Sequence, residues 1–314
     1  MDSDEVRDGV RLTNLDEVLF EGAGATKRDL VDYLDAVRDR LLPHLADRPL
    51  SVIRAVRGQR PFMQKNVPAY APEWIATVSM WAETSHREVR YALCNDRRTL
   101  LWFANQRAVE YHPTLTRVEQ PTAQTHLVLD IDPPPGDTFA LAVRATQLVR
   151  EALAGAGLHG AVKTSGAKGI HVFVPIEPTA MDHVAAATRA VAARAEHLDP
   201  ALVTTAFIRD ERGGRVFLDS TRVGGATVVA AYSPRVRPGV PVSFPVAWAD
   251  LERVAPGDFT IDTVPALMEG DPWTEEMPQP QTVDPALIAE GREIPVARVQ
   301  AMHEGKRRAR QRRG

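Results

Sequence analysis

LVLDIDPPPG, residues 127–136, ends an apolar run with two aspartates one residue apart and then places three prolines in a row. Side chains of a β-strand alternate between its two faces, so Leu127, Leu129 and Ile131 share one face and Val128, Asp130 and Asp132 share the other. Proline lacks the backbone N–H that a sheet needs, so the strand ends near Asp132. The stretch therefore predicts a strand with one buried apolar face and two carboxylates on the opposite face.

Those two carboxylates have two interpretations. Lying about 6.5–7 Å apart at Cα, they repel each other unless a cation lies between them. A pair of divalent ions, typically about 3.5–4 Å apart, would meet that need. The structural alternative is that Asp132 caps the following turn and Asp130 pairs with an arginine. This stretch by itself leaves both interpretations open.

The composition is that of a globular protein from a reducing compartment. The chain has 314 residues, of which 44% are hydrophobic and 25% are charged, enough to build a sizeable core. A single cysteine, Cys94, excludes an internal disulfide framework and a cysteine-rich zinc site. We find neither a secretion signal nor an apolar run of membrane-spanning length, and we expect a cytoplasmic, nucleoid-associated protein with no membrane partner.

The charge is unevenly distributed along the chain. The net charge is −3, yet the last nine residues, KRRARQRRG (306–314), contain six basic side chains. Such a tail is either a solvated, disordered end or an electrostatic arm that binds phosphates with an affinity that falls as salt rises.

Periodicity and turn signals predict alternating helices and strands. The expected helices cover 26–45, 138–155, 181–198 and 285–301, and the expected strands cover 51–58, 87–95, 126–131, 215–220 and 226–233. Residues 161–176 are typical of a hairpin, and 99–112 of a strand or turn that runs into a helix. This pattern predicts an α+β or mixed α/β domain over 1–270, followed over 271–314 by a proline-rich linker, a short helix and the basic tail.

A glycine-bearing turn holds several groups that suit a triphosphate. In KTSGAKGIH (163–171), a hydroxyl (Ser165), an ammonium (Lys168), an imidazole (His171) and backbone N–H groups converge. The spacing is not that of a Walker loop, and a plain glycine turn is the alternative.

Two further features bear on whether the chain binds a metal ion and phosphates. Asp219 ends the strand expected over 215–220 and either completes a three-carboxylate cage or caps a turn. Arg235 and Arg237 alternate in SPRVRPG and point the same way, which suits phosphate oxygens, although surface solubility would also explain them.

Taken in this order, three segments resemble the polymerase domain of bacterial ligase D: LDIDPP, KTSGAKGIHVFVP and FLDSTRVGGATVVAAYSPRVRPGVPVSFPVAW. That family belongs to the archaeo-eukaryotic primase superfamily and works in non-homologous end joining. The resemblance also takes in LTNLDEVLFEGAGATKRDLVDYL, RPFMQKN and LLWFANQRAVEYHP, so it covers about residues 10–275. It implies a stand-alone primase-polymerase whose core has two β-sheets flanked by helices, with the acidic cluster in the cleft between them.

The resemblance implies a role for each matched position. Asp130, Asp132 and Asp219 would hold two Mn²⁺ or Mg²⁺ ions that activate the primer 3′-hydroxyl and neutralise the triphosphate. The residues expected to bind the nucleotide are Ser165, Lys168, His171, His112, Arg235 and Arg237. The residues expected to bind DNA are Asn14 and Lys27 at a downstream 5′-phosphate, Phe62 stacked on template or base, and Lys65.

The implied activity is template-dependent addition of nucleotides, preferably NTPs over dNTPs, at gaps or breaks in DNA. Ku and a separate DNA ligase are the candidate protein partners. Two other classes stay open: a two-metal phosphohydrolase or nuclease that uses the same aspartates, and a non-catalytic DNA-binding partner of a repair ligase.

The chain departs from the family pattern at a few positions. Glu17 stands where the family often has lysine, and Met63 replaces the second phenylalanine of PFF. Ser220 and Val223 replace an aromatic residue and an asparagine after the third aspartate. Because Glu17 would repel a phosphate, we expect weak recognition of the downstream 5′-phosphate.

Overall fold

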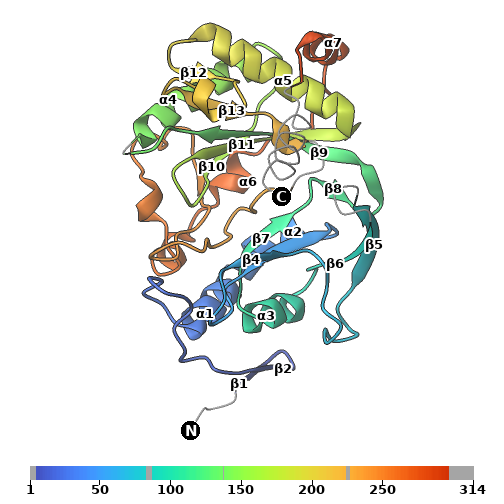
Figure 1. The fold of residues 1–314 in the computed structure, drawn as a ribbon, viewed down its shortest axis with the longest axis vertical. Coiled ribbons are helices and arrows are strands. Elements are labelled where there is room, and N and C mark those ends of the chain that lie inside the picture. Colours follow the sequence, from blue (N-terminus) through green and yellow to red (C-terminus); the bar gives the residue numbers. More distant parts are fainter. Residues whose placement is uncertain (1–4, 83–86, 137, 224–226, 297–314) are drawn as a thin grey trace, which may run out of the picture.

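Two β-sheets form the frame of the molecule. The computed structural model describes residues 5–82, 87–136, 138–223 and 227–296. In Figure 1 a seven-stranded sheet lies in the upper half, and a five-stranded sheet lies below it, nearer the N-terminus. A two-stranded ribbon of β1 (Glu5–Arg7) and β2 (Val10–Leu12) lies at the N-terminal end.

The larger sheet is built around the strand that carries the two aspartates. Its main path runs β12–β13–β9–β11–β10–β14, and β8 pairs with the start of β9. As predicted, β9 ends at Asp132, before the prolines. Its strands are β8 (Thr116–Arg117), β9 (Gln120–Asp132), β10 (Ala161–Thr164), β11 (Ile170–Ala180), β12 (Val203–Thr204), β13 (Val216–Asp219) and β14 (Pro245–Val246).

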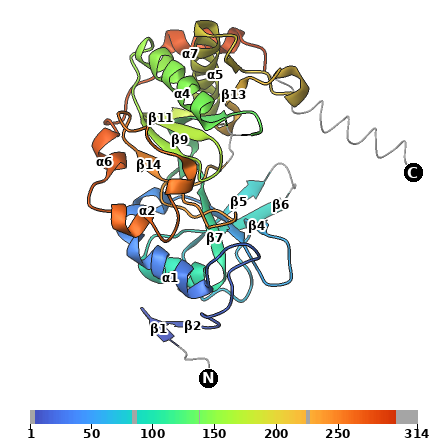
Figure 2. The same ribbon diagram turned by 90° about the vertical axis from the view of Figure 1, so that its left-hand side faces the viewer.

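Helices cover the outer face of this sheet. Helices α4 (Phe139–Ala154) and α5 (Met181–Leu198) lie on the side away from the smaller sheet, and α7 (Pro285–Glu293) packs against α5 (Figures 1 and 2). The aliphatic face of β9 is fully buried in the core, which leaves the aspartate face turned toward the smaller sheet.

The smaller sheet has the order β4–β3–β6–β5, and β7 pairs with β3 along its whole length, on the edge opposite β4 and β6. Its strands are β3 (Leu50–Arg54), β4 (Phe62–Gln64), β5 (Thr77–Ala82), β6 (Arg87–Ala92) and β7 (Ala108–Pro113). Helices α1 (Lys27–Ala36), α2 (Arg38–Leu45) and α3 (Arg97–Asn105) pack around it. Thr26 and Asp29 form the capping box at the start of α1, and the expected long helix is interrupted at Val37.

Two predictions of local structure are wrong. Residues 99–112 form a helix followed by a strand, the reverse of the expected order, because Asp96 caps α3 by accepting from the Thr99 N–H and β7 begins only after a turn at Arg107. The described part of 226–233 is no strand: Thr227 forms an isolated bridge to Thr114, and the N–H groups of Val228 and Ala230 donate to β7 carbonyls before the chain turns.

The expected linker after residue 270 packs on the body. Helix α6 (Pro272–Glu276) buries Trp273 edge-on against Phe173 of β11 at 5.2 Å, and Gln281 pairs with Ile176. The last described helix ends at Glu293, and the basic tail 306–314 lies outside the described residues, so its role stays a prediction. Short 3₁₀ helices are η1 (Arg209–Glu211), η2 (Thr221–Val223), η3 (Pro256–Asp258) and η4 (Val264–Leu267).

The fold class predicted from the sequence is confirmed: an α+β core with two sheets flanked by helices. Within the described ranges, none of the helices has the length and apolar character needed to cross a membrane.

Candidate active site

Strand register brings the polar groups of the larger sheet together. Asp130 of β9 lies directly opposite Asp219 of β13 on one side and His171 of β11 on the other. Directly opposed residues of antiparallel strands project to the same face, and Asp132 shares that face two residues further on. Three carboxylates and an imidazole therefore meet at one end of the sheet, beside a cavity of about 200 Å³.

Arg222 of η2 binds two of these carboxylates. Its Nη2 and Nε both lie 3.0 Å from Asp130 Oδ2, and its Nε lies 3.2 Å from Asp219 Oδ2. Asp130 therefore pairs with an arginine, as the structural alternative to metal binding predicted. Arg222 offsets the repulsion that two opposed carboxylates would otherwise feel.

The other carboxylate oxygens are bound by neighbours of a different kind. Asp219 Oδ1 accepts from the Thr221 N–H at 2.8 Å and from its hydroxyl at 2.6 Å, so Asp219 also caps a turn. Asp130 Oδ1 lies 3.3 Å from His171 Nε2. Burial alone would raise the pKa of Asp130, but His171 and the Arg222 guanidinium outweigh it and hold that pKa well below its ordinary value.

Asp132 differs from the other two aspartates. Its carboxylate has no hydrogen bond or ion pair within the described parts of the chain, so it does not cap the following turn. Burial and the nearby charge of Asp130 raise its pKa. An unpaired, partly buried carboxylate beside two others is costly without a cation.

The donor chemistry fits a divalent ion, with one condition. In the described ranges no three Asp, Glu, His or Cys side chains surround a common point closely enough to hold a metal as they stand. Arg222 occupies the Oδ2 atoms of Asp130 and Asp219. Those oxygens together with Asp132 make the oxygen-rich donor set that Mn²⁺ and Mg²⁺ prefer. The three aspartates therefore suit a metal provided that Arg222 moves away.

The glycine turn expected to bind phosphates lies at the rim of the same cavity. Ser165, Lys168 and His171 all line it. The Ser165 hydroxyl accepts from the N–H groups of Ala167 (3.2 Å) and Gly169 (3.1 Å), so these two donors are already used inside the turn. Lys168 Nζ donates to the Pro133 carbonyl at 2.5 Å, next to the aspartate strand.

Two positions in this turn require glycine because neighbouring atoms leave no room for a Cβ. A Cβ at Gly166, which has φ +66°, would lie 2.6 Å from the Arg235 side chain and 2.9 Å from a backbone nitrogen. A Cβ at Gly169 would lie 2.4 Å from the Ile131 carbonyl. Both glycines therefore hold the turn tightly against the strand that carries the aspartates and against the arginine segment.

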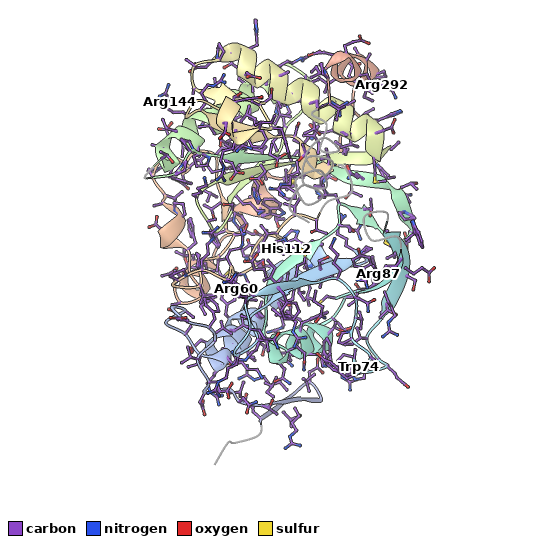
Figure 3. The ribbon with its side chains drawn as sticks, in the orientation of Figure 1. Arg60, Trp74, Arg87, His112, Arg144 and Arg292 are labelled. Atoms are coloured by element: carbon purple, nitrogen blue, oxygen red, sulfur yellow. The ribbon has the colours of Figure 1, made fainter. Side chains whose placement is uncertain are left out.

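The opposite wall of the cavity comes from the smaller sheet and from the arginine segment. Glu110 of β7 is buried and binds His112 Nε2 at 2.8 Å, Arg235 Nε at 3.0 Å and the Val236 N–H at 2.9 Å. Arg235 also donates to the Ser165 carbonyl, while Arg237 is exposed and lines the cavity. Figure 3 shows His112 between the two sheets. A single carboxylate thus holds two of the expected nucleotide-binding residues.

A lysine lies behind His171. Lys163 is fully buried, its Nζ lies 2.9 Å from His171 Nδ1, and it donates to the Ser243 hydroxyl. Burial and the nearby lysine lower the pKa of His171 to about 4. With Lys163 as donor to Nδ1, the proton of the neutral ring lies on Nε2, the atom that faces Asp130.

The two residues expected to bind a 5′-phosphate, Lys27 and Asn14, belong to the lower lobe, the half of the molecule that holds the smaller sheet, and only the side chain of Lys27 is engaged within the protein. Lys27 is buried, and its ammonium donates to the Thr13 carbonyl at 2.5 Å and to Asn105 Oδ1 at 2.7 Å. Asn14 is exposed, with φ +53°. Neither position is tested as a DNA contact, so their role stays a prediction.

Glu17 is not an isolated negative charge. Its carboxylate pairs with Arg107 at 2.7 Å and with Arg57 at 3.3 Å. Both arginines and Glu17 line a wider cavity of about 900 Å³ that shares Arg237 with the smaller one. The expected repulsion of a phosphate is therefore at least partly offset by two guanidinium groups.

The other two expected DNA contacts are available at the surface. Phe62 of β4 is 38% exposed, with the Arg54 guanidinium 5.9 Å from its ring centre, and Lys65 is also exposed. An exposed ring backed by a cation suits base stacking. Their role in binding DNA stays a prediction.

Sequence reasoning missed Arg222, Glu110 and Lys163. Arg222 follows Asp219 by three residues, and Glu110 precedes His112 by two on one strand, so both spacings were visible. Neither spacing showed which partner across the fold each residue would bind.

Comparisons with known proteins agree with this geometry. A model of the LigD primase-polymerase domain matches residues 26–273. The bifunctional non-homologous end joining protein LigD of Bacillus subtilis is 33% identical over 268 residues, which cover 83% of this chain and 43% of that protein. The multifunctional non-homologous end joining DNA repair protein LigD of Mycobacterium tuberculosis is 35% identical over 269 residues, covering 81% of this chain and 35% of that protein. The chain thus spans less than half the length of these relatives.

A solved structure shares the fold. The polymerase domain of Mycobacterium tuberculosis ligase D, in complex with DNA, superposes with a TM-score of 0.77 and 32% identity, covering 86% of this chain and 99% of that chain.

Proposed function

Because this chain belongs to the LigD primase-polymerase domain family, we propose that it is a nucleotidyltransferase that adds nucleotides, preferably NTPs, to a primer 3′-hydroxyl at gaps or breaks in DNA. The observation that carries the proposal is a single cavity with Asp130 and Asp132 on one wall and Lys168, Arg235 and Arg237 around it. Carboxylates beside a cluster of cations suit the transfer of a nucleotide from a triphosphate.

The acidic wall would serve the reacting oxygen atoms. Asp130, Asp132 and Asp219 would hold two Mn²⁺ or Mg²⁺ ions, which when bound lower the pKa of the primer hydroxyl and neutralise charge on the phosphates. His171 and Thr221 already orient one oxygen of Asp130 and of Asp219, respectively, so these two carboxylates are prepositioned.

The basic wall would hold the triphosphate. Glu110 and the Ser165 carbonyl fix the Arg235 guanidinium before any ligand arrives. A donor that is already oriented loses less conformational entropy when the phosphate binds. Lys168 and Arg237 would add charge at the rim of the cavity. His112 would line the triphosphate site without donating to it, because the single N–H of a neutral ring is already used by the Glu110 carboxylate at Nε2.

DNA is the proposed second substrate. The similar Mycobacterium tuberculosis domain was solved in complex with DNA, and the matched relatives are non-homologous end joining proteins. We place the double-stranded substrate along the lower lobe, near Phe62, Lys65 and Asn14. Ku and a separate DNA ligase remain the proposed protein partners.

One experiment separates this function from the two other classes. The full chain is incubated with a gapped duplex bearing a labelled primer, with Mn²⁺, and with each NTP or dNTP in turn. Longer products, with NTPs used more efficiently than dNTPs, are expected, and an Asp130→Asn variant should make none. Shorter products would mean a nuclease. Unchanged DNA with firm binding would mean a non-catalytic partner.

A further inference from the structure

Arg222 has an unusual position relative to the aspartates. It contacts Oδ2 of Asp130 and Oδ2 of Asp219, whereas the Oδ1 atoms of both are bound by His171 and Thr221. The oxygens that Arg222 covers are therefore the ones that no other group in the described residues uses. Neither oxygen of Asp132, the third carboxylate, is bound by a group in the described parts of the chain.

We infer that Arg222 is a built-in counter-ion of the metal-free protein, and that its guanidinium and a divalent ion bind Asp130 and Asp219 in a mutually exclusive way. This inference rests on the proposed function, because it concerns the same carboxylates. It assigns to Arg222 the role of setting how tightly the site takes up metal.

The exposure of the three side chains supports this exchange. The Arg222 side chain is 40% exposed, whereas those of Asp130 and Asp219 are 11% and 7% exposed. The carboxylates are thus held in the sheet, and the arginine approaches them from the solvent side. Arg222 also lines the cavity that contains Lys168 and Arg235, so space beside the carboxylates is open to it.

Charge gives the physical reason for such a residue. Asp130 and Asp219 lie directly opposite each other on neighbouring strands, and both would be unpaired without a cation. The guanidinium stabilises the pair when no metal is present. By linkage, a group that stabilises the metal-free carboxylates and must leave them when the metal binds lowers metal affinity by the same factor.

The test measures metal binding directly, without nucleotide or DNA. Mn²⁺ is titrated into the full chain, and free Mn²⁺ is followed by electron paramagnetic resonance. Arg222→Gln should bind Mn²⁺ at least about tenfold more tightly than the wild type, because a competing charge in contact with the carboxylates is removed. Arg209→Gln is the control: it removes an equal charge from an exposed arginine of η1 that has no carboxylate partner in the described residues, and it should leave Mn²⁺ affinity within about twofold.

Thermal unfolding of the same proteins gives a second readout. Without metal, Arg222→Gln should melt below the wild type, because two opposed carboxylates lose their counter-ion. Saturating Mn²⁺ should raise its melting temperature more than it raises that of the wild type. Arg222→Lys keeps the charge but loses the forked contact, so its melting temperature without metal should lie between those of the wild type and Arg222→Gln. The lysine variant replaces the glutamine variant in this test if the latter folds poorly.

The outcomes separate this inference from the proposed function. Equal Mn²⁺ affinities for the wild type and Arg222→Gln, with binding lost in Asp132→Asn, would overturn the role of Arg222 and leave the metal site intact. Mn²⁺ binding that is the same in Asp132→Asn as in the wild type would overturn the metal site, and the inference with it.

Discussion

The aspartate cluster of the larger sheet and the Lys27 cluster of the lower lobe both place charged groups out of water, but they do so differently. Lys27 donates to Thr13 and Asn105, and its ammonium is enclosed by protein acceptors. Asp132 has no partner in the described residues, and Asp130 and Asp219 share one partner that is itself partly exposed. A buried charge satisfied from within stabilises a fold, whereas one left incomplete is suited to bind a ligand.

The largest effect is expected for a substitution in the aspartate cluster, where the charge lacks an internal partner. Asp132→Asn should lower nucleotide addition by about 10³-fold or more, because one metal-binding carboxylate is lost. The melting temperature should hold or rise, since no internal partner is lost and repulsion with Asp130 is relieved. Primer extension and thermal unfolding check both parts. A variant that unfolds readily would show that Asp132 has a structural role.

The opposite result is expected on the lysine side. Lys27→Met should lower the free energy of unfolding by about 1–3 kcal/mol, because partly buried acceptors at Thr13 and Asn105 lose their donor. Denaturant unfolding measures the change, and Lys65→Met, at an exposed position, is the control. Unchanged stability with weaker DNA binding would mean that the Lys27 ammonium turns outward to bind DNA.

Glu110 tests whether the basic wall depends on internal pairing. Glu110→Gln keeps an acceptor for the Val236 N–H but removes the charge that holds Arg235 and His112. We expect the KM for the nucleotide to rise about tenfold, with a smaller fall in kcat, because phosphate-binding groups lose their orientation. Glu119→Gln, at an exposed position, should change neither constant. A fall in kcat of about tenfold with an unchanged KM would instead assign Glu110 to the chemical step.

The smallest effect concerns Glu17, whose charge is shared by Arg107 and Arg57. Glu17→Gln should increase the preference for a gap with a downstream 5′-phosphate by a few-fold, because the exposed ion pair between Glu17 and Arg57 is weak and Arg57 becomes free to bind phosphate. The control is Glu21→Gln, which lines the same cavity. If the wild type already prefers the phosphorylated gap by about a hundredfold, Glu17 lies away from the phosphate.

Local sequence was sufficient for elements whose apolar pattern and end signals agree. Helix α5 has the predicted bounds, 181–198, and β9 ends before the three prolines as expected. Residues 99–112 were misread because their continuous apolar run suits either element, and the deciding cap, Asp96, precedes the run. Residues 226–233 have strand-like composition, yet only a few of their N–H groups in the described part reach a neighbouring strand.

The sequence by itself determined an α+β or mixed α/β body, the shared face of Asp130 and Asp132, and the polar groups of the glycine turn, while the two sheets were implied by the resemblance to the ligase D polymerase domain. Only the tertiary structure decided that Asp219 and His171 flank Asp130, that Arg222 covers two carboxylates, and that Glu17 and Lys27 are paired within the protein. The reason is physical: alternation along a strand depends on neighbouring residues, whereas an ion pair such as that between Asp130 and Arg222 joins side chains 92 positions apart. Such contacts depend on strand register and burial, which local patterns do not specify.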